Sequence, residues 1–168
     1  MIDIRPATEN DFEAIWQIFH EIILAGDTYV NDETCTADAA HQMWLGPTVA
    51  TFVACTDGRV VGAYKLTPNT PGRGAHVANG SYIVAANHRG AGIGRQMVEH
   101  SLQQAKKAGY KAIQFNFVVS TNQSAIKLYE TFGFQTLATL PKAFHHRVLG
   151  YVDAYLMHKS LERAEDCE

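Results

Sequence analysis

The spacing of apolar residues along this chain changes between the repeat of a helix and that of a strand. Over residues 9–24, apolar side chains recur every three or four positions, so they share one face of an amphipathic helix. Thr8 and Asp11 form a capping-box pattern at the start of this helix, and Gly26 marks its end. A second, shorter helix is expected around residues 37–45.

Strand patterns surround these two helices. Residues 1–6 alternate between apolar and polar and predict a short strand. Residues 51–55 and 59–66 are rich in strand-forming side chains, and the Asp57-Gly58 pair between them favours the tight turn of a hairpin. The first half of the chain therefore predicts a strand, two helices and a hairpin, in that order.

The second half of the chain repeats a strand followed by a helix. An apolar strand at residues 77–84 leads into a glycine-rich turn and a long amphipathic helix that ends near Gly109. Residues 111–119 alternate and predict a further strand, which leads into a helix that ends at Gly133.

Two more strands are expected towards the end of the chain. They span residues 134–140 and 151–159, with a loop over residues 141–150 between them. Together the elements predict an α/β (α+β) fold with a mixed sheet of six or seven strands flanked by about four helices. The chain shows no internal repeat or linker, so we expect a single domain over residues 1–168.

Composition and charge exclude several classes of protein. With 46% hydrophobic and 18% charged residues, the chain is typical of a folded globular protein rather than a disordered one. A net charge of −3 argues against a nucleic-acid partner, which needs a basic surface. Cys35, Cys55 and Cys167 are widely spaced, which indicates neither a disulfide framework nor a metal site. The chain has no leader pattern and no apolar run of about 18 residues, so we expect no membrane partner and a cytoplasmic location.

A glycine-rich turn over residues 90–94 is the most informative stretch. Gly90, Gly92 and Gly94 let the backbone approach a ligand closely at the start of a helix, where free N–H groups favour an anion. A dinucleotide fingerprint would need a third glycine at Arg95, and the Gly-Lys-Ser/Thr of a P-loop is absent. A turn that simply tightens a strand–helix junction is the alternative to a phosphate site.

Two motifs together resemble those of the GNAT superfamily of N-acetyltransferases. Arg89-x-x-Gly92-x-Gly94 is similar to the loop with which that family binds the pyrophosphate of acetyl-CoA. The stretch from Asn122 to Phe134 is similar to a second family motif, N-x-x-A-x-x-L-Y-x-x-x-G-F. Both motifs and the predicted elements follow the family's order, so the resemblance covers about residues 2–160.

The resemblance implies a fold, a cosubstrate and a reaction. In the GNAT fold, the two parallel strands equivalent to residues 77–84 and 111–119 separate, and acetyl-CoA enters between them. The acetyl group would move directly to an amine in a ternary complex, without a metal ion. A backbone N–H near Val84 would polarise the thioester carbonyl in a catalytic role. The residues implied in acetyl-CoA binding are Ile83, Val84, Arg89, Gly90, Ala91, Gly92, Ile93, Gly94, Arg95, Asn122 and Tyr129.

Tyr129 admits two interpretations. By resemblance it is a catalytic residue that donates a proton to the departing CoA thiolate, while Asn122 helps to hold the pantetheine arm. A phenol with an unperturbed pKa of about 10 keeps its proton at neutral pH and can serve as this acid. Tyr129 also shares an apolar helix face with Ala125, Leu128 and Phe132, which is the pattern of a core tyrosine.

Asn79 and Asn116 are candidate ligands for the acceptor. Residues 114–122, with residues 140–143, resemble a subgroup that includes the yeast-type N-acetyltransferase of proline analogues such as azetidine-2-carboxylate. In that subgroup, two asparagines on the separated strands hold the carboxylate of the substrate. Asparagine is uncommon in strands, although it can also satisfy a backbone group at an edge or bulge. The subgroup differs from this chain in having a tryptophan at the position of Tyr129.

The sequence leaves the general base open. Neither expected cleft strand carries a carboxylate, so water or a loop histidine, among His76, His145 and His146, would take the proton of the amine. The absence of acidic residues on these strands also disfavours polyamines and aminoglycosides as acceptors.

We therefore expect an acetyl-CoA-dependent N-acetyltransferase that acts on a small-molecule amine, namely an amino acid or an amino-acid analogue. A protein or peptide N-acetyltransferase is one alternative, and a non-catalytic acyl-CoA-binding sensor of the same fold is another. The resemblance is also compatible with a homodimer.

Overall fold

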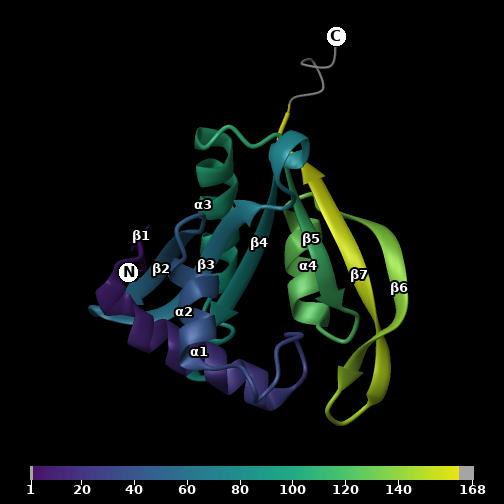
Figure 1. Cartoon of the computed structure of the whole chain (residues 1–168), viewed down its shortest axis with the longest axis horizontal. Coiled ribbons are helices and arrows are strands. Elements are labelled where there is room, and N and C mark those ends of the chain that lie inside the picture. The colour runs from purple at the N-terminus through teal and green to yellow at the C-terminus, as the bar shows by residue number, and fades with distance from the viewer. Residues whose placement is uncertain (1, 163–168) are drawn as a thin grey trace.

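A seven-stranded sheet forms the centre of the computed structural model, which describes residues 2–162 (Figure 1). The strand order is β1-β2-β3-β4-β5-β7-β6, and all neighbours are antiparallel except β4 and β5. The strands are β1 (Asp3–Pro6), β2 (Ala50–Thr56), β3 (Arg59–Pro68), β4 (Val77–Val84), β5 (Ala112–Val119), β6 (Gln135–His146) and β7 (Gly150–Ser160). The parallel pair therefore lies in the middle of the sheet, with antiparallel strands on both sides.

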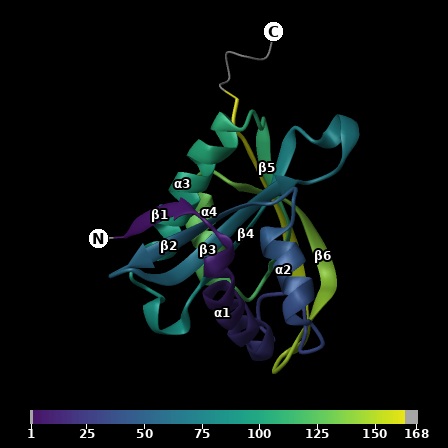
Figure 2. The ribbon, with the colours of Figure 1, turned by 60° about the vertical axis from the view of Figure 1, so that its left-hand side comes forward.

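Two helices cover each face of the sheet (Figure 2). They are α1 (Phe12–Ala25) and α2 (Ala37–Leu45) on one face, and α3 (Ile93–Lys107) and α4 (Gln123–Thr131) on the other. Val53, Ala63 and Ile83 belong to the core beneath α1 and α2. Tyr64 and Phe115 belong to the core beneath α3 and α4. Seven strands and four helices within the described residues confirm the predicted mixed α/β fold.

Alternation along β4 sends its side chains to the two faces in turn. Ile83 packs beneath α1 and α2, so Asn79 and Ser81 point to that face as well. Ala78 and Tyr82 pack on the opposite side, beneath α3 and α4. One strand therefore contributes apolar and polar side chains to two different environments.

The two parallel strands β4 and β5 part after a short stretch of pairing. They are paired at three positions, from Val77 with Ala112 to Asn79 with Gln114. Beyond this point β4 stays paired with β3 as far as Val84, while β5 stays paired with β7. The separation that the resemblance implied is therefore confirmed.

The predicted loop over residues 141–150 is wrong for most of its length, because β6 runs to His146 and β7 begins at Gly150, so only residues 147–149 lie outside a strand. Strand β6 continues through Pro141 and remains paired with β7. A proline is tolerated there because β6 is an edge strand, where a missing N–H needs no partner. The ladder is irregular at this point, since Lys142 has a φ of +51° and donates its N–H to the Asp153 carboxylate.

The described residues also bear on membranes, metals and thiols. Between residues 2 and 162, no helix is long and apolar enough to cross a bilayer. Over the same range, no three His, Cys, Asp or Glu side chains are grouped so that they could hold a metal ion. Cys35 and Cys55 are free thiols, and Cys167 lies outside the described residues.

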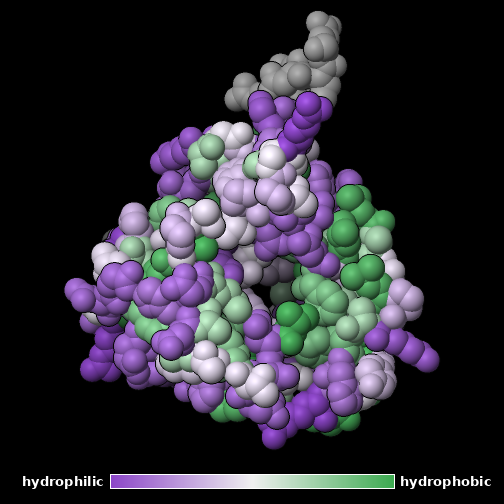
Figure 3. Space-filling view, viewed as in Figure 1, coloured by the Kyte–Doolittle hydropathy of each residue, from purple (hydrophilic) through white to green (hydrophobic). Residues whose placement is uncertain are grey.

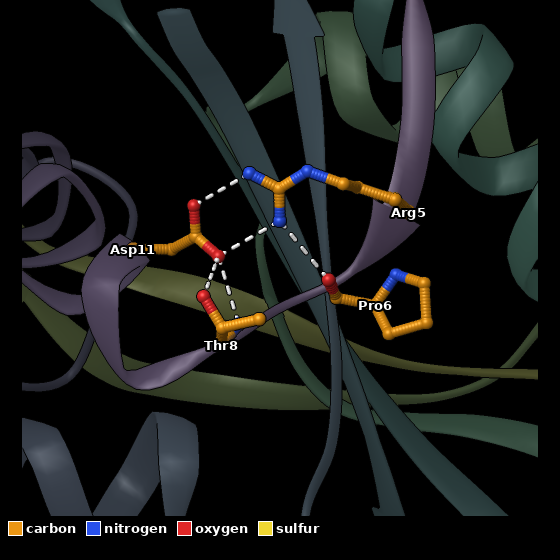
Figure 4. Close-up of polar contacts among 4 residues, drawn as sticks. All are labelled: Arg5, Pro6, Thr8 and Asp11. Atoms are coloured by element: carbon orange, nitrogen blue, oxygen red, sulfur yellow. Dashed lines mark hydrogen bonds and ion pairs between the residues drawn. The ribbon is translucent and has the colours of Figure 1, made fainter.

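An ion pair joins β1 to the start of α1 (Figure 4). Both terminal nitrogens of the Arg5 guanidinium donate to the Asp11 carboxylate, at 2.8 and 2.7 Å. The N–H and the hydroxyl of Thr8 donate to the same carboxylate at 2.7 and 2.8 Å, which confirms the predicted capping box. The pKa of Asp11 lies well below its usual value because the hydrogen bonds from Arg5, aided by those from Thr8, outweigh the effect of burial.

We expect Asp11→Asn to lower the free energy of unfolding by about 2 kcal/mol at neutral pH, because several donors lose a charged acceptor. A lowered pKa in the folded state stabilises the protein above the unfolded pKa of about 4, and this stabilisation is lost as the pH falls. The gap between wild type and variant should therefore shrink below about pH 4 in urea unfolding. Glu13→Gln, at an exposed position on α1, is the control and should change stability by less than about 0.5 kcal/mol. A gap that does not depend on pH would contradict this account of the ion pair.

Candidate active site

A cavity of about 1070 Å³ occupies the space between the separated strands β4 and β5. Its wall reaches from the glycine turn and α4 on one face to the segment after α1 and to β3 on the other. Figure 3 shows a hollow near the middle of the molecule in this view. The sequence-predicted residues that line the cavity are Asn79, Ile83, Val84, Arg89, Gly90, Gly92, Ile93, Gly94, Arg95, Asn116, Asn122 and Tyr129, whereas Ala91 lies in the turn without lining it.

The glycine turn leaves the start of α3 open to a ligand. Gly90 and Gly92 have φ of +81° and +78°, a left-handed conformation that favours glycine. Gly92 is the residue that caps α3, and it has no side chain to cap the helix itself. Within residues 2–162, no hydrogen bond uses the N–H groups of Ile93, Gly94 or Arg95. These donors and the positive end of the helix dipole are therefore available to an anion on the cavity wall.

Cationic side chains surround the same turn. Arg89 and Arg95 both line the cavity and are exposed, and the Arg95 guanidinium lies 5.2 Å from the centre of the Phe132 ring. No acidic residue lies in the first turn of α3. The end of the cavity near α3 is therefore electropositive, as a pyrophosphate would require.

The open edge of β4 presents backbone groups to the cavity. The Asn69 N–H donates to the Val77 carbonyl at 2.8 Å, and the Ala85 N–H donates to the Val61 carbonyl at 2.9 Å. Because hydrogen-bonded pairs alternate in an antiparallel ladder, the odd-numbered residues of β4 bond to β3. The even-numbered residues, including Val84, therefore direct their N–H and C=O groups toward the gap.

The segment after α1 is tied to this open edge. The Tyr29 hydroxyl donates to the carbonyl of Tyr82 at 3.2 Å, which is one of the groups that face the gap. The Tyr29 ring packs edge-on against Phe19 of α1, with ring centres 5.2 Å apart. Tyr29 was not among the sequence candidates, and only its place in the fold brings it to the cavity.

Tyr129 serves both the core and the cavity. Its ring packs against Phe115, Phe134 and Tyr82, at centre-to-centre distances of 4.4, 5.8 and 6.0 Å. Its hydroxyl makes no hydrogen bond to any described residue, and the side chain lines the cavity. Burial, with smaller contributions from Tyr82 and Tyr29, raises the pKa of Tyr129 well above its usual value. The phenol therefore holds its proton at neutral pH.

Asn122 is the cap of α4 and also lies on the cavity wall. Its Oδ1 accepts from the Ala125 N–H at 3.3 Å and from the Ser124 hydroxyl at 3.1 Å. Its Nδ2 takes part in no hydrogen bond with the described chain, so that group is available to a ligand. The helix cap therefore fixes the side chain without using its donor.

The two predicted acceptor residues are joined through a third asparagine. Asn79 on β4 and Asn116 on β5 both direct their Nδ2 groups at the Oδ1 of Asn69, at 3.4 and 2.6 Å. Gln114 donates to the Oδ1 of Asn116 at 2.8 Å. This amide network bridges β4 and β5 at the point where they separate. Asn69 follows β3, and nothing in its sequence context distinguished it from an ordinary turn residue.

Lys65 is a second residue that the sequence did not single out. It lies on β3 opposite Ser81, on the side of α1 and α2, and it lines the cavity. Its Nζ donates to the Met43 carbonyl at 2.9 Å and lies 5.2 Å from the centre of the Trp44 ring. Burial lowers the pKa of Lys65 to about 8. A lysine in an alternating strand normally points to solvent, so its local pattern gives no signal of this site.

The three loop histidines differ in position. His146 lines the cavity, but its Nδ1 accepts from the N–H groups of Val148 and Leu149, at 3.1 and 3.2 Å. Two backbone donors therefore occupy the Nδ1 atom of His146. His76 and His145 are exposed and do not line the cavity.

Comparison with known proteins shows that the chain is similar to acetyltransferases. The sequence profile of the Acetyltransferase (GNAT) family matches residues 12–134. The N-acetyltransferase aca1 of Schizosaccharomyces pombe is 35% identical over 98% of this chain and 73% of its own length. The L-amino acid N-acetyltransferase AaaT of Escherichia coli is 30% identical over 93% of this chain and 96% of its own.

Solved structures share the fold. A GCN5-related N-acetyltransferase from Kribbella flavida superimposes with a TM-score of 0.91 at 43% identity, over 95% of this chain and 97% of its own. An acetyltransferase from Salmonella typhimurium, solved with acetyl-CoA, reaches a TM-score of 0.83 at 24% identity, over 97% and 95% of the two chains. At that identity the second likeness concerns the fold alone.

We expect Gly92→Ala to lower the free energy of unfolding by about 1 kcal/mol, because a left-handed φ is strained for alanine. A methyl group added at Gly92 meets no atom within 4 Å, so backbone strain is the whole cost. Gly94→Ala is the matched control: its φ is not left-handed, and its methyl group would lie 3.4 Å from Leu128. Urea unfolding should show no loss of stability for Gly94→Ala, and equal losses for the two variants would contradict the assignment of strain to Gly92.

Proposed function

Because the chain belongs to the Acetyltransferase (GNAT) family and is an acetyl-CoA-dependent N-acetyltransferase, we propose that its acceptor is the amine of a small amino acid or analogue. The observation that carries this proposal is the cavity itself, which reaches both faces of the sheet through the gap between β4 and β5. One face offers a helix N-terminus with arginines, and the other offers amide groups and a single lysine. Two substrates can thus approach each other from opposite sides.

Acetyl-CoA fits the side of α3 and α4. The free N–H groups at the start of α3, with Arg89 and Arg95, would bind the pyrophosphate. The free Nδ2 of Asn122 would donate to the pantetheine arm. The N–H of Val84, which faces the gap, would donate to the oxygen of the thioester carbonyl.

The chemical step then needs few groups. The amine nitrogen attacks the thioester carbon, and the negative charge that develops on oxygen is stabilised by the Val84 N–H. The carbon–sulfur bond breaks as the Tyr129 hydroxyl gives its proton to the departing thiolate. Burial raises the proton affinity of thiolate and phenolate alike, so the raised pKa of Tyr129 does not prevent the transfer.

The acceptor fits the side of α1 and α2. Asn79 and Asn116 each have one amide hydrogen beyond the bond to Asn69, and the Lys65 ammonium has two hydrogens beyond the bond to Met43. Among the residues that line the cavity, Lys65 is the only lysine or arginine away from the glycine turn. The amide hydrogens and the positive charge of Lys65 are suited to bind the carboxylate of an acceptor. An L-amino acid N-acetyltransferase among the relatives supports an amino-acid acceptor.

We expect CoA release, followed with a thiol reagent, for amino acids and proline analogues but not for polyamines, aminoglycosides or a histone-like peptide. Lys65→Met and Asn116→Ala should each raise the KM for a carboxylate acceptor by about tenfold or more, with the KM for acetyl-CoA unchanged. The effect of Lys65 should fade above about pH 8, because its ammonium loses its charge there. The decarboxylated amine is the control and should show no such change. Turnover confined to peptides or polycations would contradict the amino-acid acceptor, and acetyl-CoA binding without turnover would indicate a sensor.

We expect Tyr129→Phe to lower kcat by about a hundredfold, because the thiolate would leave without its proton donor. The KM for acetyl-CoA and the stability should stay close to wild type, since the hydroxyl makes no hydrogen bond to the described chain. Tyr151→Phe removes the hydroxyl of a tyrosine that is 69% exposed and is the matched control, with unchanged kcat. Full activity of Tyr129→Phe would show that Tyr129 is not the proton donor to the thiolate.

A further inference from the structure

One acidic side chain lies on the wall of the cavity. Among the described lining residues, Asp27 is the only aspartate or glutamate. It directly follows Gly26, whose left-handed φ of +64° ends α1. It therefore stands on the side of α1, α2 and Lys65, where the acceptor is placed by the function proposed above.

The carboxylate of Asp27 lacks a partner. Its Oδ1 is buried and makes no hydrogen bond with any described residue. None of the ion pairs within residues 2–162 includes Asp27. An unpaired buried carboxylate oxygen is costly, so it needs an explanation such as a bound ion or a catalytic role.

The segment that carries Asp27 is held in place from two sides. Two residues later, the Tyr29 hydroxyl bonds the Tyr82 carbonyl on the open edge of β4. One residue earlier, the Gly26 carbonyl accepts from the Arg147 N–H at 3.0 Å. The backbone on both sides of Asp27 is therefore anchored, with the residue on the cavity wall that Val84 also lines.

The three histidines that the sequence offered are less suitable as bases, and His88, which also lines the cavity, stands just before the glycine turn with its Nδ1 2.7 Å from the Oδ1 of Asn87. The cleft strands carry no carboxylate among the cavity-lining residues, and His146 has its Nδ1 occupied by two N–H donors. His76 and His145 lie away from the wall. Asp27 thus supplies the proton acceptor that the strands of the cleft lack.

We propose that the Asp27 carboxylate binds the ammonium group of the acceptor and removes the proton that blocks its lone pair. This inference rests on the proposed function. Transfer converts an ammonium and a carboxylate into a neutral amine, whose lone pair can attack the thioester, and a carboxylic acid. The same arrangement places a negative group for the ammonium and a positive one, Lys65, for the carboxylate of one amino acid.

The protons balance over the reaction. The amine formed at Asp27 attacks the thioester carbon to form a carbon–nitrogen bond, and the carbon–sulfur bond breaks. The thiolate takes a proton from Tyr129, and the nitrogen loses a second proton as the amide forms, which restores the Tyr129 phenol. Asp27 releases the first proton to water, so the products are the N-acetyl compound, CoA thiol and one proton.

The test compares an amino acid with its aminooxy analogue, which keeps the carboxylate but whose nucleophilic nitrogen is unprotonated at pH 7 and needs no base. We expect Asp27→Asn to lower kcat/KM for the amino acid by about a hundredfold and to leave the aminooxy analogue within about threefold of wild type. Asp27→Glu should recover part of the activity on the amino acid. Asp32→Asn, at another acidic residue of the segment between α1 and α2 that does not line the cavity, is the matched control and should not change either rate. Rates are corrected for the reaction without enzyme.

Two outcomes would overturn the role of Asp27. Equal losses with both acceptors would show a structural effect, and unchanged rates with both would show that the carboxylate takes no part. Thermal unfolding of Asp27→Asn separates misfolding from the first outcome, and we expect no loss of stability because no hydrogen bond is removed. Wild-type protein that turns over no amino acid would instead contradict the proposed acceptor class.

Discussion

The separation of β4 and β5 is the constraint on which the rest of the structure depends. Two parallel strands in the middle of a sheet would normally satisfy each other's backbone groups along their whole length. Here they pair at three positions and then diverge, because β4 stays hydrogen-bonded to β3 while β5 stays hydrogen-bonded to β7. The gap leaves N–H and C=O groups of β4 without a strand partner. A ligand that adds to this open edge can replace the missing ladder.

The gap is held open by different contacts on the two faces. On the side of α3 and α4, Tyr82, Phe115, Tyr129 and Phe134 form an aromatic cluster around the diverging strands. On the side of α1 and α2, the amide network around Asn69 bridges the strands where they part. An apolar support on one face and a polar one on the other give the cavity its two chemical halves.

Alternation along the strands assigns residues to these halves. Neighbouring positions of β4 belong to different faces, so Tyr82 lies on the side of α3 and α4 while Ser81 faces the side of α1 and α2. Charges follow the same division. Arg89 and Arg95 lie at the glycine turn, whereas Lys65 and Asp27 lie toward α1 and α2. The proposed roles of these residues follow from their placement on opposite sides of one sheet.

Sequence alone determined the order of the elements, the capping box at Thr8, the glycine turn and the family, because each depends on residues close together in the chain. For Tyr129 and Asn122 the sequence offered alternatives, and the structure shows that a ring can pack in the core, or a side chain can cap a helix, while also reaching the cavity. The error at residues 141–150 arose because a proline reads as a loop unless its strand is known to be an edge. Only the tertiary structure brought Asp27, Lys65 and Asn69 to the cavity, since strand order and register decide which distant residues meet, and no local pattern encodes them.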